Sequence, residues 1–396
     1  MAYAFSLGDV AFLRSREGGE ALKACSALGL TEASRLADVA AARRLVGPEH
    51  AAAVLETLLL RRKAEAKVDG GGRWLFTDEA LQQASASPVA AYRAERLAGR
   101  DVHDVTCSVG ADLVALARTA RRCIGSDVDE VRLAMAAHNC AVSDVAPALV
   151  RADALRPVSR GTVVVADPAR RDAAGRRRWR PEDFVPALDD LAAAYAGQPL
   201  MVKCAPGLDP RAAPWAREIE IISLDGRVRE ASLLSEELAT AARRATVLRS
   251  DGSAWSITDA DPDDVPVGEA GEWLVDPDGA VVRAGLVRHY AARYGLRQLD
   301  PRIAYLTGDT PPPGVRAFRV LDSGRYSEKA LRALLRRHDV GRLEILVRGV
   351  DVDPDALRRR LKPRGTTEAS VVITRIGRTA VAFLCRAERI PETPTG

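Results

Sequence analysis

The sequence predicts an α/β protein, with a doubly wound and mostly parallel sheet, a helical region before it and a small α+β domain after it. Three observations predict this class. The first 100 residues carry helical patterns, residues 101–258 alternate short apolar runs with helical stretches, and residues 315–396 alternate strand-like and helical segments. The 396 residues suffice for two or three domains. We expect a helical domain over 1–100, the sheet domain over 101–258, a connector over 259–314 and the α+β domain over 315–396.

The N-terminal region is predicted to be all helical. Several of its segments open with Thr, Ser or Pro ahead of acidic residues and close on Gly, as helices commonly begin and end. The expected helices cover residues 20–30, 31–47, 48–68, 77–85 and 87–99. A glycine-rich break at 70–72 predicts a turn, and we interpret Trp74 and Phe76 after it as packing residues.

The central region carries short apolar runs that are rich in β-branched residues and flanked by turn signals. Such runs are typical of strands buried on both faces of a parallel sheet. They cover residues 101–107, 122–128, 148–154, 161–168, 199–206 and 218–224. Two further strands, over 226–235 and 243–250 and separated by a helix over 236–242, are expected as an antiparallel pair at the sheet edge.

The remaining chain reads as a connector followed by the small domain. Residues 259–314 are rich in Asp, Pro and Gly and carry one helical pattern, at 280–295. After them we expect two helices, at 327–338 and 353–362, against a sheet. The expected strands of that sheet cover residues 315–321, 342–349, 368–377 and 379–388.

Composition restricts the class of protein. With 47% hydrophobic and 28% charged residues, and no apolar run long enough to span a membrane, the chain is expected to be a folded, soluble protein. No secretory signal is visible, which predicts a cytoplasmic location. The six cysteines form no C-x-x-C pair and the five histidines lie at no metal-ligand spacing from them, so we expect neither disulfides nor a metal site.

Charge is uneven along the chain. The net charge is +4, but residues 316–396 carry 18 Lys and Arg against 10 Asp and Glu, a local charge of +8. A basic domain is typical of a protein with a polyanionic partner. A biased genome composition, rich in Arg and Ala, explains the same numbers equally well, so both interpretations stay open.

The stretch from Asp104 to Asp112 places small residues where a strand must turn sharply into a helix. Such a turn lets a ligand approach the backbone. A nicotinamide site would require G-x-G-x-x-G here, whereas this turn has only Gly110. S-adenosylmethionine has no pyrophosphate and needs no such cradle, and Asp104 can bind its ammonium group. A purely structural strand-to-helix turn remains the alternative.

Carboxylates follow the next three strands. Asp127, 17 residues after Gly110, is placed to accept hydrogens from both ribose hydroxyls of a nucleoside. Asp153 is placed for the adenine amino group, or equally for an N-cap. Asp167 and Pro168 end a very apolar strand, where a carboxylate and a carbonyl could accept hydrogens from an attacking amine.

The series D-x-x-C-S-x-G-x-D, S-D-V-D, A-D-A, D-P-A-R and V-K-C-A-P-G resembles class I S-adenosylmethionine-dependent methyltransferases. The helical lead-in resembles a bacterial branch of that family, and the C-terminal segment resembles its THUMP-like domain. The resemblance implies a Rossmann-like methyltransferase sheet with S-adenosylmethionine as cofactor and Asp167-Pro168 as the acceptor pocket. It implies that the cofactor contacts Asp104, Cys107, Ser108, Gly110, Asp112, Asp127 and Asp153.

Two departures from the family pattern bear on these expectations. Ser108 stands where the turn more often has Gly, which predicts weaker cofactor binding. Ala169-Arg170 replaces the Pro-aromatic pair of amino-methylating D-P-P-Y enzymes. That change leaves no stacking ring for a flipped base and leaves the acceptor open.

Candidate substrate-binding residues follow the D-P-A-R motif. Six arginines lie between residues 170 and 180, where basic and aromatic side chains could hold phosphates and stack on a base. The candidates are Arg170, Arg171, Arg176, Arg177, Trp179 and, at the end of the next strand, Lys203. A solvated loop with a packing Trp is the alternative, and Cys204 is interpreted as a buried strand residue rather than a nucleophile.

The leading hypothesis is therefore a methyltransferase that modifies a base of RNA, either rRNA or tRNA, with the basic C-terminal domain binding the substrate. A small-molecule methyltransferase is the first alternative. The second is a non-catalytic RNA-binding protein with a degenerate cofactor site. A nicotinamide oxidoreductase fits least, because the turn lacks the required glycines. The sequence leaves open the RNA, base and atom, the oligomeric state and the role of the N-terminal helices.

Overall fold

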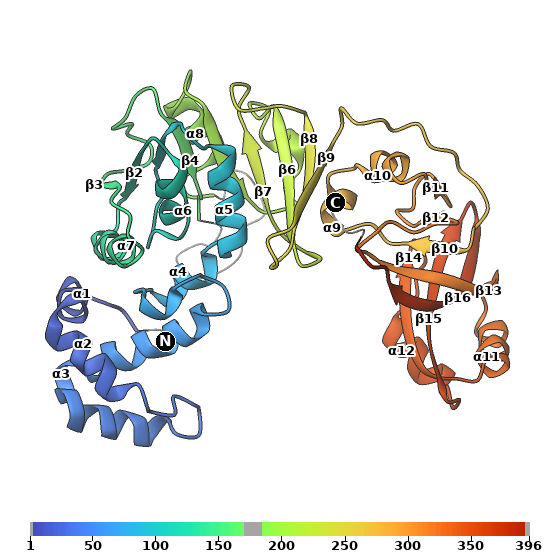
Figure 1. Ribbon diagram of the computed structural model, residues 1–396, viewed down its shortest axis with the longest axis horizontal. Helices are drawn as coiled ribbons and strands as arrows, with labels where there is room; N and C mark the ends of the chain where they lie inside the picture. Colours follow the sequence, from blue (N-terminus) through green and yellow to red (C-terminus); the bar gives the residue numbers. More distant parts are fainter. Residues whose placement is uncertain (1–2, 170–183, 393–396) are drawn as a thin grey trace. The chain divides into compact units, whose positions relative to one another are not determined.

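The computed structural model describes residues 3–169 and 184–392 of the chain (Figure 1). The chain forms two compact units, the first built mainly from residues up to 225 and the second mainly from residues after 254. The finer division into four parts stays a prediction. No helix in the described part of the chain is long and apolar enough to cross a lipid bilayer.

Five helices precede the first strand. Their bounds are α1 (Leu7–Arg14), α2 (Arg16–Cys25), α3 (Arg35–Ala64), α4 (Asp78–Gln83) and α5 (Ser87–Arg96), with a short 3₁₀ turn at Gly71–Arg73. The side chains of Ser6, Ser15 and Thr77 each accept a backbone N–H at the start of a helix. The boundary expected between residues 47 and 48 is observed, because α3 consists of two helices that meet at the non-helical Gly47 (φ 82°, ψ 157°), just before Pro48.

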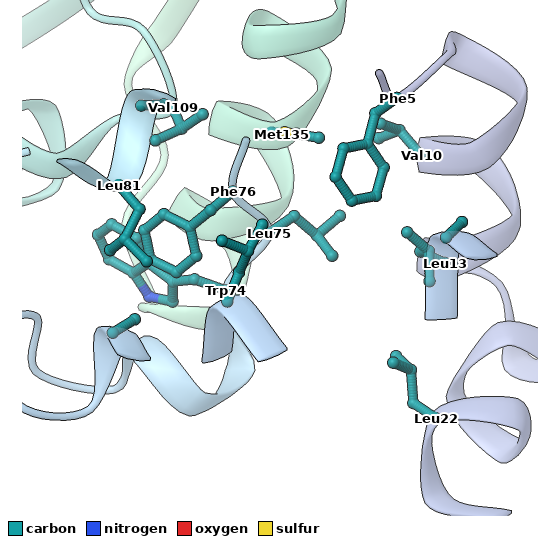
Figure 2. Close-up of a cluster of buried hydrophobic side chains, with 14 of the residues drawn as sticks. Phe5, Val10, Leu13, Leu22, Trp74, Leu75, Phe76, Leu81, Val109 and Met135 are labelled. Atoms are coloured by element: carbon teal, nitrogen blue, oxygen red, sulfur yellow. The ribbon is translucent and has the colours of Figure 1, made fainter. Parts of the chain in front are cut away.

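The N-terminal helices share one hydrophobic core with the first helices of the sheet domain, α6 (Ala111–Thr119) and α7 (Glu130–Val142). Figure 2 shows part of this core, in which Phe5 and Val10 approach Met135, and Phe76 lies between Leu81 and Met135. Trp74 and Phe76 are packing residues, as expected.

Buried Asn139 of α7 ties this core to the turn after the first strand. Its Oδ1 accepts the N–H of Leu75 at 2.7 Å, and its Nδ2 donates to the carbonyls of Leu75 (2.9 Å) and Val109 (2.8 Å). Buried amides are costly unless they are bonded in this way. The helical lead-in therefore fixes the backbone of the strand-to-helix turn.

A nine-stranded sheet has the order β3-β2-β1-β4-β5-β7-β6-β8-β9. Its parallel part is β1 (Asp101–Asp104), β2 (Arg122–Asp127), β3 (Ala148–Arg151), β4 (Val163–Ala166) and β5 (Leu200–Cys204), with α8 (Leu188–Ala194) before β5. The strand order reverses between β1 and β4, because chain connections leave β1 toward β2 on one side and reach β4 on the other. Such a switch point is where doubly wound sheets bind ligands.

The sheet continues with β6 (Glu218–Leu224), β7 (Arg227–Leu234), β8 (Arg243–Leu248) and β9 (Ala254–Thr258), after a 3₁₀ turn at Pro210–Ala212. β7 pairs antiparallel with β5, and Asp225-Gly226, both at positive φ, joins β6 to β7 in a tight hairpin. The helix expected over 236–242 is wrong, since these residues form turns and bends. There the carboxylate of Glu218 accepts the N–H of Thr240 at 2.7 Å and holds the backbone out of a helix.

The second unit contains a seven-stranded sheet of order β11-β12-β10-β13-β16-β15-β14. Its strands are β10 (Trp273–Val275), β11 (Arg297–Gln298), β12 (Leu306–Gly308), β13 (Arg316–Arg325), β14 (Val340–Arg348), β15 (Thr367–Ile376) and β16 (Thr379–Arg389). The expected connector thus supplies three strands to the sheet of the C-terminal domain. Its expected single helix is two, α9 (Gly279–Arg283) and α10 (Val287–Arg293), because Gly285 between them has φ 71°.

Two amphipathic helices pack on the C-terminal sheet, α11 (Glu328–Arg337) and α12 (Pro354–Leu361). Leu331, Leu335 and Leu357 bury their side chains in one cluster with Val371 and Leu384 of the sheet. The exposed faces of both helices carry arginines in their last turns. The expected order of strands and helices in this domain is the observed one.

Candidate functional site

A cleft of about 430 Å³ lies at the carboxyl ends of β1 to β5, at the switch point of the sheet. This volume is in the range of small-molecule and cofactor sites. Eight of the predicted site residues line it: Asp104, Cys107, Ser108, Asp112, Asp127, Asp153, Asp167 and Lys203. The structure therefore brings together, in one place, carboxylates that follow four different strands.

The turn after β1 is built from two residues at positive φ. Ser108 has φ 49° and Gly110 has φ 89°, and the N–H of Gly110 donates to the carbonyl of Cys107 at 2.8 Å. Gly110 precedes α6 and shapes the turn without lining the cleft. Because the left-handed region favours glycine, the conformation of Ser108 explains why related turns more often have Gly there.

Asp127 sits at the end of β2 with both carboxylate oxygens held by backbone. Its Oδ2 accepts the N–H of Ser108 at 2.9 Å, and its Oδ1 accepts the N–H of Asp129 at 2.9 Å. Each carboxylate oxygen has two lone pairs, so one on each oxygen is left for a ligand. A ribose diol, with two adjacent hydroxyl donors, fits this arrangement.

Asp104 is the most deeply buried carboxyl of the cleft. Burial raises the pKa of Asp104 well above its ordinary value, and the nearby Asp112 carboxylate raises it further. Among the described residues, its side chain receives a hydrogen bond only from the N–H of Thr106, at 3.3 Å. A buried carboxyl so poor in donors is suited to a cationic ligand, since an ammonium group would stabilise its charged form.

Asp153 follows β3 and begins a turn rather than a helix. Its Oδ1 accepts the N–H of Leu155 at 2.9 Å, and its carbonyl accepts the N–H of Arg156. Asp153 therefore caps a turn and not the helix that was the alternative prediction. Its side chain still lines the cleft. Its role toward adenine stays a prediction.

Cys107 and Asp112 line the cleft but are engaged by the protein. Burial raises the pKa of the Cys107 thiol well above its ordinary value, so the group is neutral. Burial also raises the pKa of Asp112, but Arg93 and Lys203 outweigh it and hold that pKa below its ordinary value. The carboxylate of Asp112 pairs with the guanidinium of Arg93 and accepts a hydrogen bond from Ser85 at 3.0 Å.

The acceptor side of the cleft is centred on Asp167. Its N–H donates to Oγ1 of Thr106 at 2.6 Å, and its Oδ2 accepts from Nζ of Lys203 at 2.6 Å. Pro168 beside it is buried and, unlike Asp167, does not line the cleft, so its predicted role stays a prediction. Ala169 then exchanges two backbone hydrogen bonds with Val185. Lys203 itself is only 5% exposed and also donates to Ser85.

Five of the predicted substrate-binding residues lie outside the described residues: Arg170, Arg171, Arg176, Arg177 and Trp179. Cys204 is fully buried in β5. Within the ranges 3–169 and 184–392, no three metal-ligating side chains come together.

Four residues of the site were missed from the sequence. Thr106 lies in the turn, whereas Ser85, Arg93 and Glu230 come from segments far away along the chain. Glu230 gives one local signal, a charge within a strand that was predicted over 226–235. Ser85 and Arg93 give no such signal, because the sequence around them has the pattern of ordinary helices and marks neither residue as functional.

Comparisons with known proteins agree with this geometry. A family model described as THUMP domain-like matches residues 315–387, and a domain of unknown function (DUF8688) matches residues 6–64. The sequence is 53% identical over 351 residues to uncharacterized S-adenosylmethionine-dependent methyltransferases of two Mycobacterium tuberculosis strains, CDC 1551 and H37Rv. These matches cover 85% of this chain and 97% of each relative.

A solved structure has the same fold. A protein of Porphyromonas gingivalis W83, provisionally assigned as a methyltransferase, superposes with a TM-score of 0.71 over 93% of this chain and 98% of its own. The two sequences are 20% identical, so this likeness concerns the fold alone. It covers both the sheet domain and the C-terminal domain.

Proposed function

This chain belongs to the S-adenosylmethionine-dependent methyltransferases, and from that premise we propose that it methylates a base of RNA. The cofactor is S-adenosylmethionine, which supplies a methyl group activated by a sulfonium. The enzyme's task is then to hold the acceptor atom in line with that methyl. The observation that carries the proposal is the combination of a catalytic cleft with a basic, THUMP-like domain in one chain.

We assign the cofactor to the half of the cleft that follows β1, β2 and β3. Asp127 would accept hydrogens from the ribose hydroxyls, Asp104 would hold the methionyl ammonium, and Asp153 would lie at the adenine. The free lone pairs of Asp127 and the donor-poor burial of Asp104 fit these groups. The turn residues Cys107, Ser108 and Gly110 would shape the wall beside the methionine.

We assign the acceptor to the half of the cleft beside Asp167. Within the described part of the chain, Oδ2 of Asp167 is bound by Lys203 and Oδ1 has no partner. A carboxylate oxygen can accept a hydrogen from an amino group and so orient the nitrogen lone pair toward the methyl. Asp167, with the backbone of Pro168 beside it, would bind such an exocyclic amine.

A basic hollow on the C-terminal domain supports RNA as the substrate. The hollow, of about 470 Å³, is bordered by Arg332, Arg336, Arg360, Lys362 and Arg364, with Asp339 as its one acidic residue among those described. Glu328 pairs with Arg332 and Arg360, whereas Arg336, Lys362 and Arg364 have no ion pair within the described ranges. Unpaired cations around a hollow are suited to phosphates of a nucleic acid backbone.

Transfer of labelled methyl from S-adenosylmethionine tests the proposal. RNA from a strain that lacks this gene, so that its target sites are unmodified, is compared with the small-metabolite fraction of the same cells. We expect label in the RNA, and nuclease mapping then identifies the base. Label only in the metabolites would overturn RNA as the substrate and make the chain a small-molecule methyltransferase.

A paired substitution tests the hollow. Arg336→Glu with Lys362→Glu reverses two unpaired charges, so methyl transfer to RNA should fall about tenfold or more and its salt dependence should flatten. Lys329→Glu, on the exposed surface of α11 outside the hollow, is the matched control. Equal losses in both proteins would show a general charge effect and contradict a specific site.

A further inference from the structure

A buried ion network connects the acceptor carboxylate to the N-terminal helices. Nζ of Lys203 lies 2.6 Å from Oδ2 of Asp167, 3.1 Å from Oγ of Ser85 and 3.4 Å from the carbonyl oxygen of Gln83. It also lies 3.8 Å from Oδ2 of Asp112. An ammonium has three N–H donors, and the three hydrogen-bond acceptors here use all of them.

Two partners of Lys203 come from the N-terminal helical region: Gln83 is the last residue of α4, and Ser85 lies in the segment that joins α4 to α5. Ser85 is in turn tied to Asp112, and Arg93 of α5 bridges Asp112 and Glu230 with both of its terminal nitrogens. Arg93, Glu230 and Lys203 are each at most 5% exposed. A network of this kind, with its charges paired away from water, is rigid because breaking one pair leaves a buried charge uncompensated.

A second lysine reinforces the same segment. Nζ of Lys67 donates to the carbonyls of Leu81 (2.8 Å) and Gln82 (2.9 Å), at the carboxyl end of α4. Burial lowers the pKa of Lys67 to about 8, with Lys203 and Arg229 as further causes. Two cations therefore hold three successive carbonyls, those of residues 81, 82 and 83, in place near Asp167.

We propose that Lys203 and Ser85 are positioning residues for methyl transfer, and that the α4–α5 segment thereby forms part of the acceptor half of the cleft. Lys203 has no donor left for a substrate, so it acts on the reaction by fixing the orientation of Asp167. With Oδ2 fixed, the other oxygen is held ready for the acceptor's N–H. This inference rests on the proposed acceptor role of Asp167, and it gives the N-terminal helices a part in catalysis.

Lys203→Met tests the proposal in the full-length enzyme. It keeps most of the apolar stem but removes the charge, so Asp167 can rotate out of place, and a misplacement of about 1 Å costs about 100-fold in rate. We expect kcat to fall about 100-fold, with KM for the acceptor and the Kd of S-adenosylmethionine nearly unchanged. Lys203→Arg should restore part of kcat, and Ser85→Ala should lower it about fivefold by removing one hydrogen bond.

Lys63→Met is the matched control, because Lys63 pairs with Asp78 at 3.4 Å on the exposed surface of the same helical region. It should leave kcat unchanged. Rates are measured in whichever fraction, RNA or metabolite, takes the label, so a failure of RNA as substrate is separate from a failure of this inference. A kcat of Lys203→Met within about threefold of the parent overturns the positioning role.

A crystal structure of the Lys203→Met protein gives a readout that needs no activity. We expect the Asp167 carboxylate to leave its present orientation while β4 and β5 keep theirs. An Asp167 side chain that stays in place without Lys203 would overturn the proposal, whatever the substrate proves to be. If Asp167→Ala instead retains turnover, the proposed acceptor site itself fails.

Discussion

The two halves of the cleft are held together in different ways. In the cofactor half, carboxylates are fixed by backbone N–H groups at most 19 residues away in sequence: Asp127 by Ser108 and Asp129, and Asp153 by Leu155. In the acceptor half, Asp167 is fixed by side chains from elsewhere, and the contacts of Lys203 with Asp167 and Ser85 span 36 and 118 residues.

This difference indicates which half depends on the rest of the chain. Backbone donors remain available after most side-chain substitutions, so the cofactor half should tolerate changes outside its own carboxylates. The acceptor half is a chain of buried ion pairs, which is sensitive to the loss of any one member. We therefore expect cofactor binding and turnover to be separable by mutation.

The largest effect is expected at the acceptor half. Asp167→Ala removes the group that would orient the acceptor, so turnover should fall about 1,000-fold or more. Binding of S-adenosylmethionine, measured by calorimetry, should stay within about threefold, because the proposed cofactor contacts lie after other strands. Intact turnover would contradict the acceptor assignment, and a joint loss of binding would show that the two halves are one unit.

In the cofactor half, we expect a substitution to weaken the binding of S-adenosylmethionine itself. Asp127→Ala removes the proposed ribose contacts and the acceptor for two backbone N–H groups, so S-adenosylmethionine affinity should fall at least about 100-fold. Asp129→Ala is the matched control, since it removes the N-cap of α7 and an ion pair with Arg132 but keeps the backbone N–H that Asp127 accepts. Calorimetry measures the affinity of both variants for S-adenosylmethionine. Equal affinities would contradict the proposal that Asp127 binds the ribose.

A smaller, pH-dependent effect is expected at Asp104. Burial raises the pKa of Asp104 well above its ordinary value, so this carboxyl keeps its proton to a higher pH than an exposed Asp and must lose it to pair with an ammonium. Affinity for S-adenosylmethionine should therefore rise with pH as the Asp104 carboxyl loses its proton, for as long as the α-amino group of the ligand stays charged. Calorimetry in two buffers of different ionisation enthalpy should detect proton release on binding.

Asp104→Asn supplies the comparison for that measurement. It cannot ionise, so proton release should disappear, and affinity at the upper end of the pH range should be about tenfold weaker. The gap between the two proteins should narrow as the pH falls. Proton release that persists in the variant would assign it to another group and contradict the role of Asp104.

Much of the fold could be predicted because each central strand is a short apolar run that ends in an acidic residue or a turn. The prediction failed where local pattern and tertiary contact disagree. Residues 236–242 have helix-forming composition, yet Glu218 binds the N–H of Thr240. The strands β10 to β12 are two or three residues long and leave no periodic signal.

In the candidate site too, residues marked by the local sequence pattern could be predicted, whereas residues that depend on tertiary contacts could not. Asp104, Asp127, Asp153 and Asp167 could be located from the sequence because each lies at, or within two residues of, the carboxyl end of its own strand, where parallel sheets bind ligands. Ser85, Arg93 and Glu230 could not, because their importance comes from partners more than 100 residues away. The acceptor half is therefore the half that sequence reasoning describes least well.

The smallest effect is expected from Ser108→Gly, in the turn of the cofactor half. Ser108 has φ 49°, a conformation that costs an ordinary residue about 1 kcal/mol and glycine almost nothing. The hydrogen bond to Asp127 comes from the backbone, so glycine keeps it. Relief of strain stabilises the folded protein, whereas the greater conformational freedom of glycine stabilises the unfolded chain. Because the two effects nearly cancel, the free energy of unfolding should change by less than about 1 kcal/mol.

Affinity for S-adenosylmethionine in the Ser108→Gly protein should equal or exceed that of the parent by up to about fivefold, since the turn is already in place and only its strain is lost. Ser108→Val, a β-branched residue in the same conformation, should destabilise the protein by more than 1 kcal/mol, about the strain expected there. Thermal unfolding and calorimetry measure both effects. A large loss of affinity in the glycine variant would mean that the Ser108 hydroxyl itself binds the cofactor. Cofactor binding would then depend on a side chain of the turn as well as on its backbone.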